Sequence, residues 1–336
     1  MTPVLLDCDP GHDDAVAMIY AAHHMNLVGV TTVFGNQSID LVTNNALGLR
    51  QLMQRDFPVA KGAGKPLVGE RIEAGVVHGK TGLDGAELPT PDRGAEDMHA
   101  VELILRTARA HRGELVLAAT GALTNVALAL SVEPKLREWL RGITIMGGST
   151  GSGNVTQCAE FNIYADPEAA DAVLMAGVET WLVGLDVTRR VGVGAADIAR
   201  LRQGGRLART MGDLLDFFLQ SLKRVQGIDT ASLHDPCALV PFIDPSLMEY
   251  RHTGVRVELA GGLTRGHDGR RTAPPRQCAA RLHAPLAARQ CPSRARTLAA
   301  PVAAHRAGNA RLRRDTDLTE THHGPQTHSR RRYRHR

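Results

Sequence analysis

The chain has 336 residues, of which 43% are hydrophobic, and a formal net charge of +5. This length allows one large α/β domain or two smaller ones, either with a sizeable buried core. Because no apolar run is long enough to span a membrane and no leader pattern opens the chain, we expect a soluble, cytoplasmic protein without a membrane partner. The five cysteines lie at irregular spacing without a CxxC pair, which argues against a disulfide framework and a zinc site.

The first predicted elements enclose a dense group of acidic residues. Residues 4–8 are predicted to form a buried strand, and a helix is predicted after Pro10-Gly11. This segment carries four carboxylates, those of Asp7, Asp9, Asp13 and Asp14. Like charges about 4 Å apart repel by roughly 4 kcal/mol at an effective dielectric near 20, so a folded site needs a cation, protons or donors here. Ordinary N-cap aspartates would explain only one or two of the four, and calcium or magnesium would satisfy them all.

Strands and helices are then predicted to alternate. The predicted strands are residues 27–33, 58–60, 114–119, 143–146, 180–185 and 255–259. The predicted helices are residues 41–53, 98–110, 123–130, 195–202, 207–225 and a segment that begins at Pro167. Such βα units favour an α/β fold with a mainly parallel, Rossmann-like open sheet flanked by helices. Residues 62–94 are predicted to form a long loop, which in a compact domain is typically functional or mobile.

Polar side chains follow two of the predicted strands. Asn36 comes after the strand 27–33, and a second group, Asn154, Glu160 and Asn162, lies in the loop after the strand 143–146. Amides and a carboxylate in one loop can bind several hydroxyl groups at once, as sugars present them, although they can also serve only to cap the loop. The glycine-rich segments match neither a P-loop nor a dinucleotide-binding motif.

Histidines supply candidate acids. His234 precedes Asp235, which would add a further carboxylate to the site, although Asp235 before Pro236 also suits a plain helix N-cap. His78 lies in the long loop and, taken alone, is typical of an ordinary loop histidine.

Six motifs in order resemble the inosine-uridine-preferring nucleoside hydrolases. They are Asp7-Cys8-Asp9-Pro10-Gly11-His12-Asp13-Asp14, Phe34-Gly35-Asn36-Gln37, Ala119-Thr120-Gly121-Ala122-Leu123-Thr124-Asn125, Met146-Gly147-Gly148, Ala159-Glu160-Phe161-Asn162 and His234-Asp235-Pro236. The resemblance extends from residue 4 to about residue 265. It implies a nucleoside hydrolase fold and a calcium-dependent enzyme of nucleoside salvage that splits a ribonucleoside into ribose and free base.

The resemblance also implies a role for each matching residue. Asp9 would be the general base that activates water and a Ca²⁺ ligand, together with Asp14, Asp235 and the backbone carbonyl of Thr120. His234 would be the acid that protonates the leaving base. Glycosidic cleavage passes through an oxocarbenium-like state, which needs such a base, such an acid and anionic surroundings. A histidine with an ordinary pKa would be suited to donate a proton at neutral pH.

The remaining implied roles concern the substrate. Asp13 and Asn36 would bind the ribose 2′-hydroxyl, and Asn162 with Asp235 the 3′-hydroxyl. Asn154 and Glu160 would bind the 5′-hydroxyl, and His78 would lie close to the base. The resemblance further implies a homodimer or homotetramer.

Two other functions stay open from the sequence. One is an inactive or binding-only relic of the family. The other is a magnesium-dependent phosphatase that would use Asp7 and Asp9 as an Asp-x-Asp pair, although no phosphate-binding Lys or Thr constellation accompanies them.

The C-terminal segment has a different composition from the body of the chain. Residues 266–336 contain 16 Arg, no Lys and four acidic residues, a sum of +12 that leaves −7 for residues 1–265. This Arg-, Ala-, Pro- and His-rich tail lacks Ile, Phe, Met and Trp, so it is predicted to be disordered. A nucleic-acid-binding arm would typically mix Lys with Arg, and we expect no nucleic-acid partner. We divide the chain into a hydrolase domain, residues 1–265, that lacks its C-terminal end, and a tail, residues 266–336.

A shifted reading frame would explain this tail. The family usually continues Met-Thr-Val-Val where this chain has His267-Asp268-Gly269-Arg270, and His and Asp codons read one nucleotide later restore Met-Thr. We therefore predict that resequencing the DNA around codon 267 will reveal a shifted frame. An intact frame that encodes this tail, with no restorable family C-terminus, would refute the hypothesis.

Overall fold

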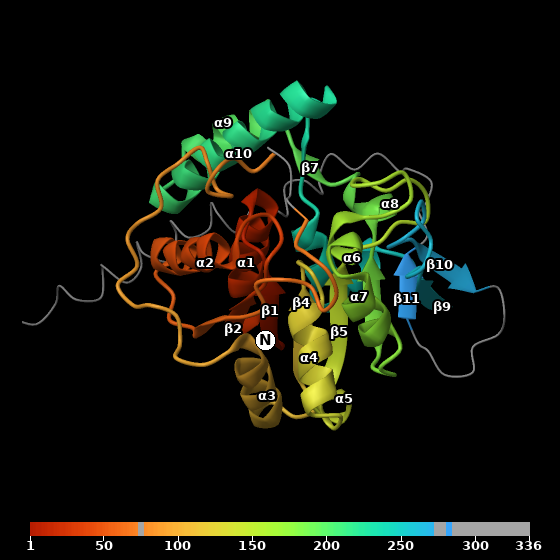
Figure 1. Ribbon diagram of the computed structural model, residues 1–336. Coiled ribbons are helices and arrows are strands. Elements are labelled where there is room, and N and C mark those ends of the chain that lie inside the picture. Colours follow the sequence, from red (N-terminus) through yellow and green to blue (C-terminus); the bar gives the residue numbers. More distant parts are fainter. Residues whose placement is uncertain (73–76, 272–279, 284–336) are drawn as a thin grey trace, which may run out of the picture.

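The computed structural model describes residues 1–72, 77–271 and 280–283 of the chain (Figure 1). A nine-stranded sheet has the order β10-β9-β11-β6-β5-β4-β1-β2-β3, and helices flank it. Its strands are β1 (Pro3–Cys8), β2 (Asn26–Thr32), β3 (Val59–Lys61), β4 (Leu115–Ala119), β5 (Leu140–Met146), β6 (Thr180–Val183), β9 (Tyr250–Val257), β10 (Asp268–Arg271) and β11 (Ala280–His283). A separate pair comprises β7 (Gly192–Val193) and β8 (Ala231–Ser232).

The helices connect these strands. The α-helices are α1 (His12–His24), α2 (Ile39–Met53), α3 (Ala100–Ala110), α4 (Thr124–Val132), α5 (Leu136–Trp139), α6 (Phe161–Ala165), α7 (Pro167–Leu174), α8 (Leu185–Thr188), α9 (Ala195–Arg202), α10 (Arg206–Gln226) and α11 (Val240–Ile243). Two 3₁₀ helices, η1 (Asp235–Leu239) and η2 (Pro245–Leu247), complete them. Within the described residues, no helix is long and apolar enough to cross a membrane.

Six neighbouring strands of the sheet, in the order β3-β2-β1-β4-β5-β6, pair in parallel, as the alternation of predicted strands and helices indicates. Side chains of β1 point alternately to the two faces of the sheet. Val4 and Leu6 pack into a core with α1, α2 and α10, whereas Leu5 packs into a second core with α3, α4 and α7. The predicted mainly parallel, Rossmann-like α/β sheet with helices on both faces is therefore confirmed.

The sheet does not end at the predicted boundary after residue 265. Strand β10 pairs antiparallel with β9, and β11 pairs with both β9 and β6. Asp268 in β10 is buried, and its Oδ1 accepts a hydrogen bond from the backbone N–H of Ser149 at 2.9 Å. These short segments, which are predicted from the sequence to belong to a disordered tail, thus form strands of the sheet, β10 at its edge and β11 between β9 and β6. The rest of the predicted tail, residues 272–279 and 284–336, lies outside the described residues.

A buried polar link joins β1, β2 and α4 just below the carboxyl end of the sheet. Asn125 Nδ2 donates to Asp7 Oδ1 at 2.8 Å and to the carbonyl oxygen of Thr32 at 2.9 Å. The Asn125 Oδ1 accepts from the backbone N–H of Ala63 at 2.9 Å. Burial raises the pKa of Asp7 to about 7, against the lowering effect of its bonds to Thr31 and Asn125. One side chain thus satisfies polar groups of three segments.

We expect Asn125→Ala to lower the free energy of unfolding by about 2–3 kcal/mol, because it leaves buried polar groups without a partner. Urea denaturation measures this value. Ser131→Ala is the matched control on the same helix, because Ser131 is exposed and, within the described part of the chain, its hydroxyl bonds only the carbonyl of Ala127. Equal stability of the two variants would contradict the assigned role of Asn125.

Candidate active site

The carboxyl ends of three strands and the N-terminus of helix α1 lie at one edge of the sheet. Strands β2, β1 and β4 lie side by side and in parallel, so their carboxyl ends lie at the same edge (Figure 1). Asp9 follows β1, Asn36 follows β2 and Thr120 follows β4, while Asp13 and Asp14 lie in the first turn of α1. In open α/β sheets, this edge is where ligands bind.

Three carboxylates converge there. Asp13, Asp14 and Asp235 are all buried, and each offers an oxygen within 4.8 Å of the others. Asp235 belongs to η1, which packs against α1, so two segments more than 200 residues apart in the chain supply the cluster. Of these three, Asp14 and Asp235 are predicted metal ligands from the sequence, whereas Asp13 is predicted to bind the sugar.

Asp9 lies beside this cluster and is held from one side. Its Oδ2 accepts from the backbone N–H of Asn36 at 2.6 Å, whereas its Oδ1 is buried and has no hydrogen-bond partner among the described residues. Burial and the nearby charge of Asp14 raise the pKa of Asp9 well above its usual range. A buried carboxylate oxygen without a donor is the feature that a bound cation would satisfy.

The pKa values of the other three carboxyl groups are raised as well. Burial, together with the charge of Asp14, raises the pKa of Asp13 to about 7. Burial raises that of Asp14 to about 6, although donors from Gly11 and Thr120 oppose the shift. Burial and the charges of Asp13 and Asp14 raise the pKa of Asp235 well above its usual range. The cluster therefore has more negative charge than its protein donors can stabilise, and its hard oxygen atoms suit a cation such as Ca²⁺ or Mg²⁺.

Thr120 contributes with two of its groups. Its hydroxyl donates to Asp14 Oδ1 at 2.8 Å, and its carbonyl oxygen accepts from Asn162 Nδ2 at 2.8 Å. A carbonyl oxygen has two lone pairs, so the predicted metal bond from this atom remains compatible with its hydrogen bond.

Two asparagines place their amide nitrogen atoms toward the protein. Asn36 Nδ2 donates to the carbonyl oxygen of Asp9 at 3.0 Å and to Asp14 Oδ2 at 3.3 Å. Asn162 Nδ2 donates to the carbonyl oxygens of Thr120 and Met146. Each side chain keeps its Oδ1 as the acceptor for another group, which fits the predicted contact with a hydroxyl.

Glu160 and Asn154 have local roles in the loop that precedes and includes α6. Glu160 is buried, and its Oε2 accepts from the backbone N–H groups of Gly148, Asn162 and Ile163, so it caps α6. Burial raises the pKa of Glu160 to about 7. Asn154 is exposed, and its Oδ1 accepts from the backbone N–H of Phe161 at 2.8 Å. Among the described contacts, this loop joins the carboxylate cluster through Asn162.

The predicted acid His234 does not have the ordinary pKa that the sequence analysis assumed. Burial, with a smaller effect of the Arg189 charge, lowers the pKa of His234 to about 4, so the ring is neutral at pH 7. Its Nδ1 lies 2.8 Å from Thr188 Oγ1. A hydroxyl can donate to that nitrogen, which leaves the ring proton on Nε2.

His78 reaches the same region from the long loop. Its Nδ1 lies 3.1 Å from Nδ1 of His12, the first residue of α1. Burial and the neighbouring rings of His12 and His234 lower the pKa of His78 well below its usual range. Sequence analysis placed His78 near the substrate but assigned no role to His12.

Three further residues were missed from the sequence. Asp84 accepts with its backbone carbonyl from the ring of His12, and Thr31 with Asn125 holds Asp7. A motif of one or two residues gives no signal for such contacts, since they join segments far apart in the chain. Thr31 and Asn125 both donate to Oδ1 of Asp7, so this carboxylate links elements of the sheet and its helix. These bonds favour a structural role for Asp7 over membership of the Asp-x-Asp pair of a phosphatase.

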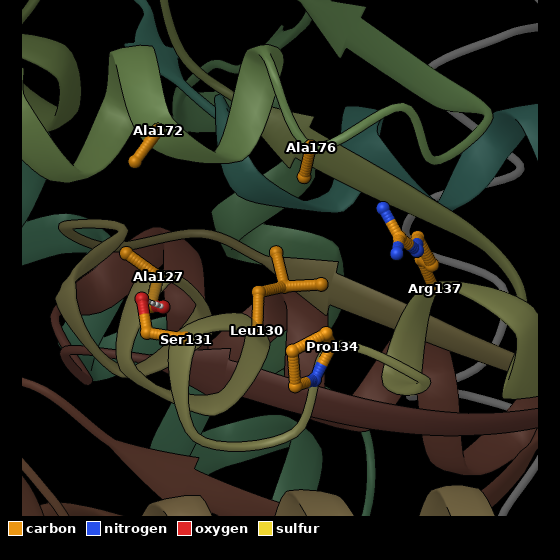
Figure 2. A pocket seen from close by; sticks show the side chains of 7 residues that line it. All are labelled: Ala127, Leu130, Ser131, Pro134, Arg137, Ala172 and Ala176. Carbon is orange, nitrogen blue, oxygen red and sulfur yellow. Dashed lines mark hydrogen bonds between the residues drawn. The ribbon is translucent and has the colours of Figure 1, made fainter.

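A separate hollow of about 170 Å³ opens between α4 and α7 (Figure 2). Its lining is made of small or apolar side chains with one serine and one arginine: Ala127, Leu130, Ser131, Pro134, Arg137, Ala172 and Ala176. None of the carboxylates or histidines described above lines it.

Comparisons with known proteins agree with the geometry. A family model for the inosine-uridine preferring nucleoside hydrolases matches residues 4–288. The pyrimidine-specific ribonucleoside hydrolase RihA of Shewanella woodyi is 45% identical over 269 residues, which are 79% of this chain and 86% of that protein. RihA of Enterobacter sp. (strain 638) is 44% identical over 269 residues, with the same two coverages of 79% and 86%.

Solved structures show the same architecture. The purine-preferring ribonucleoside hydrolase from Gardnerella vaginalis superposes with a TM-score of 0.84 at 27% identity, over 90% of this chain and 98% of that one. The plant nucleoside hydrolase PpNRh1 superposes with a TM-score of 0.81 at 30% identity, over the same two shares of 90% and 98%. The family predicted from the six motifs is confirmed, and the chain belongs to the inosine-uridine preferring nucleoside hydrolases, which are glycosidase enzymes.

Proposed function

We propose that this enzyme hydrolyses the N-glycosidic bond of ribonucleosides with Ca²⁺ as its cofactor, and that it prefers pyrimidine nucleosides. The observation that carries the proposal is the buried Oδ1 of Asp9, which has no partner among the described residues and lies beside Asp13, Asp14 and Asp235. The pyrimidine preference rests on the relatives at 44–45% identity, whose names state that specificity. The purine-preferring structure is more distant, at 27% identity.

The residues of this site would hold the metal and the sugar together. Asp9, Asp14, Asp235 and the Thr120 carbonyl form the proposed ligand set, and Asp13 is close enough to support it. A bound calcium ion would supply the positive charge that keeps these carboxylates ionised and favours deprotonation of nearby water.

The ribose hydroxyls would bind to acceptors that the protein leaves open. Asn36 with Asp13 would bind the 2′-hydroxyl, and Asn162 with Asp235 the 3′-hydroxyl. In each asparagine, the amide nitrogen already donates to the protein, so the amide oxygen would accept the hydrogen bond from the ribose hydroxyl. Glu160 and Asn154 remain the proposed partners of the 5′-hydroxyl.

Two proton transfers accompany cleavage. Asp9 would take a proton from the attacking water as the new C–O bond forms at the anomeric carbon, and the surrounding carboxylates would stabilise the developing oxocarbenium charge. The C–N electron pair leaves with the base, which would receive a proton from the imidazolium form of His234, the minor form of this ring at pH 7. Asn36 keeps Asp9 in place through its backbone N–H.

Activity of the purified protein separates this function from an inactive relic. We expect purified protein to release ribose from uridine and cytidine faster than from inosine, and to lose activity after treatment with a chelator and recover it with Ca²⁺. A reducing-sugar assay over a nucleoside panel measures this. Asp9→Asn is the matched control and should lower kcat by about 10²–10⁴-fold, because the base is lost while the shape is kept.

The panel gives a distinct result for each alternative. No turnover of any nucleoside by correctly folded, calcium-loaded protein would establish a binding-only relic. Faster cleavage of inosine would refute the pyrimidine preference but not the hydrolase.

The role of His234 can be tested through the leaving group. We expect His234→Ala to lower kcat for natural nucleosides by about 10²-fold or more, since their bases need a proton to depart. A riboside with an activated phenolate leaving group needs no such proton, so its turnover should fall far less. Equal losses for both substrates would contradict the assignment of His234 as the acid.

A further inference from the structure

The ring of His12 lies fully buried at the start of α1. Its relative exposure is 0%, and it stacks on Phe218 and Phe217 of α10 with ring centroids 5.1 and 5.7 Å apart. Its Nε2 lies 2.9 Å from the backbone carbonyl oxygen of Asp84. A carbonyl oxygen can only accept, so Nε2 of His12 carries a hydrogen.

The other nitrogen of His12 faces a second imidazole. Its Nδ1 lies 3.1 Å from Nδ1 of His78, and the two rings stack with centroids 5.3 Å apart. Two lone pairs would repel at this distance and two hydrogens would clash, so a single proton lies between these nitrogens.

The surroundings decide which ring carries that proton. If His12 carried it, both of its nitrogens would be protonated, and a cation would be buried between phenyl rings with a carbonyl as its polar partner. The carboxylate of Asp84 is instead occupied by the backbone N–H of Lys80 and by the N–H and hydroxyl of Thr81. The proton is therefore placed on Nδ1 of His78.

A competing contact shows what His12 prevents. The backbone N–H of His12 lies 3.4 Å from the same Nδ1 of His78, a long contact that would require a lone pair there. Without an acceptor on the side chain of residue 12, this amide would become the partner of His78 Nδ1, and the ring proton would move to Nε2. The side chain of residue 12 thus selects between two tautomers of His78.

We propose that His12 is a positioning residue that fixes His78 with its proton on Nδ1, so that Nε2 of His78 offers a lone pair to an N–H or O–H donor of the substrate. The hydrogen bonds of His78 within the described part of the chain all involve Nδ1, which leaves Nε2 for another group. A Cβ added at Gly11 would lie 2.8 Å from His78 Nδ1 and 2.7 Å from Asn36 Nδ2, so the ring lies against the acidic loop, residues 9–11 between β1 and α1. The substrate part of this inference rests on the proposed function, whereas the tautomer does not.

Nitrogen-15 NMR of the imidazoles tests the tautomer in the full-length protein. At mildly alkaline pH, where histidine is ordinarily neutral, we expect a protonated-type shift at Nδ1 of His78 and an unprotonated-type shift at Nε2. The His78 signals are assigned by their loss in His78→Gln. The opposite pattern in the unmodified protein would overturn the proposal without any variant.

Substitutions at residue 12 then test the cause. His12→Phe keeps an aromatic ring but removes the acceptor, so we expect the two His78 shifts to exchange and kcat/KM for the best nucleoside to fall by about 10- to 100-fold. His12→Asn places Oδ1 near the position of Nδ1 and should restore the original tautomer and part of the activity. Phe217→Leu removes one stacking ring but keeps His12, so its His78 shifts should stay as in the unmodified protein.

Each result has one meaning. Unchanged His78 shifts in His12→Phe would show that residue 12 does not select the tautomer. Exchanged shifts with unchanged kcat/KM would show that Nε2 of His78 accepts nothing from the substrate. A complete lack of nucleoside cleavage in the unmodified protein would refute the proposed function while the shifts still report the tautomer.

Discussion

The structure depends on keeping four carboxylates together with little exposure to solvent. Asp9, Asp13, Asp14 and Asp235 are each 6% exposed or less, and burial is the first cause of the raised pKa in every one. A fold maintains such a group only with counter-charge, protons or donors. Here the backbone and side-chain donors bind the outer oxygens, as Asn36 does for Asp9 and Thr120 for Asp14. The Oδ1 of Asp9 keeps no hydrogen-bond partner among the described residues, and Asp13, Asp14 and Asp235 each offer an oxygen within 4.8 Å of the others, an arrangement that suits a hard cation.

Some polar groups around this centre form hydrogen bonds within the protein, and others have no partner among the described residues. Asn125 and Thr31 secure the end of β1 through Asp7, one layer below the site. Asn36 and Asn162 secure the loops above it with their amide nitrogens and leave an oxygen open. Because the residues that fix the loops are also the proposed ligand contacts, a change that loosens the scaffold would also change the site. This coupling is typical of sites whose geometry has to be set before the substrate binds.

How much the sequence predicts depends on the distance between partners along the chain. Asp9, Asp13 and Asp14 lie within one strand-turn-helix unit, so local pattern was enough to place them together. The contacts of His12 with His78 and Asp84 span 66 and 72 residues, and no periodicity encodes them. The pKa of His234 was misjudged because its burial arises from the packing of η1 and α8, which composition does not reveal. Strands β10 and β11 were missed because their residues lack an apolar alternation, and pairing with β9 and β6 rather than propensity gives them their form.

The long loop that carries His78 is anchored rather than open, and this makes its histidine a fixed part of the site. Asn45 of α2 donates to the carbonyl oxygens of Pro10 and Thr81, and so ties the acidic loop to the long loop directly. Gln37 donates to the carbonyl oxygen of Gly79, whose φ of +79° brings its Cα against Asp84, so a Cβ there would lie 2.3 Å from that carboxylate. Each tie ends within a few residues of His78 or of Asp9. These contacts fix the backbone near His78, so the choice of tautomer falls to the hydrogen-bond partner of its ring, which among the described residues is His12.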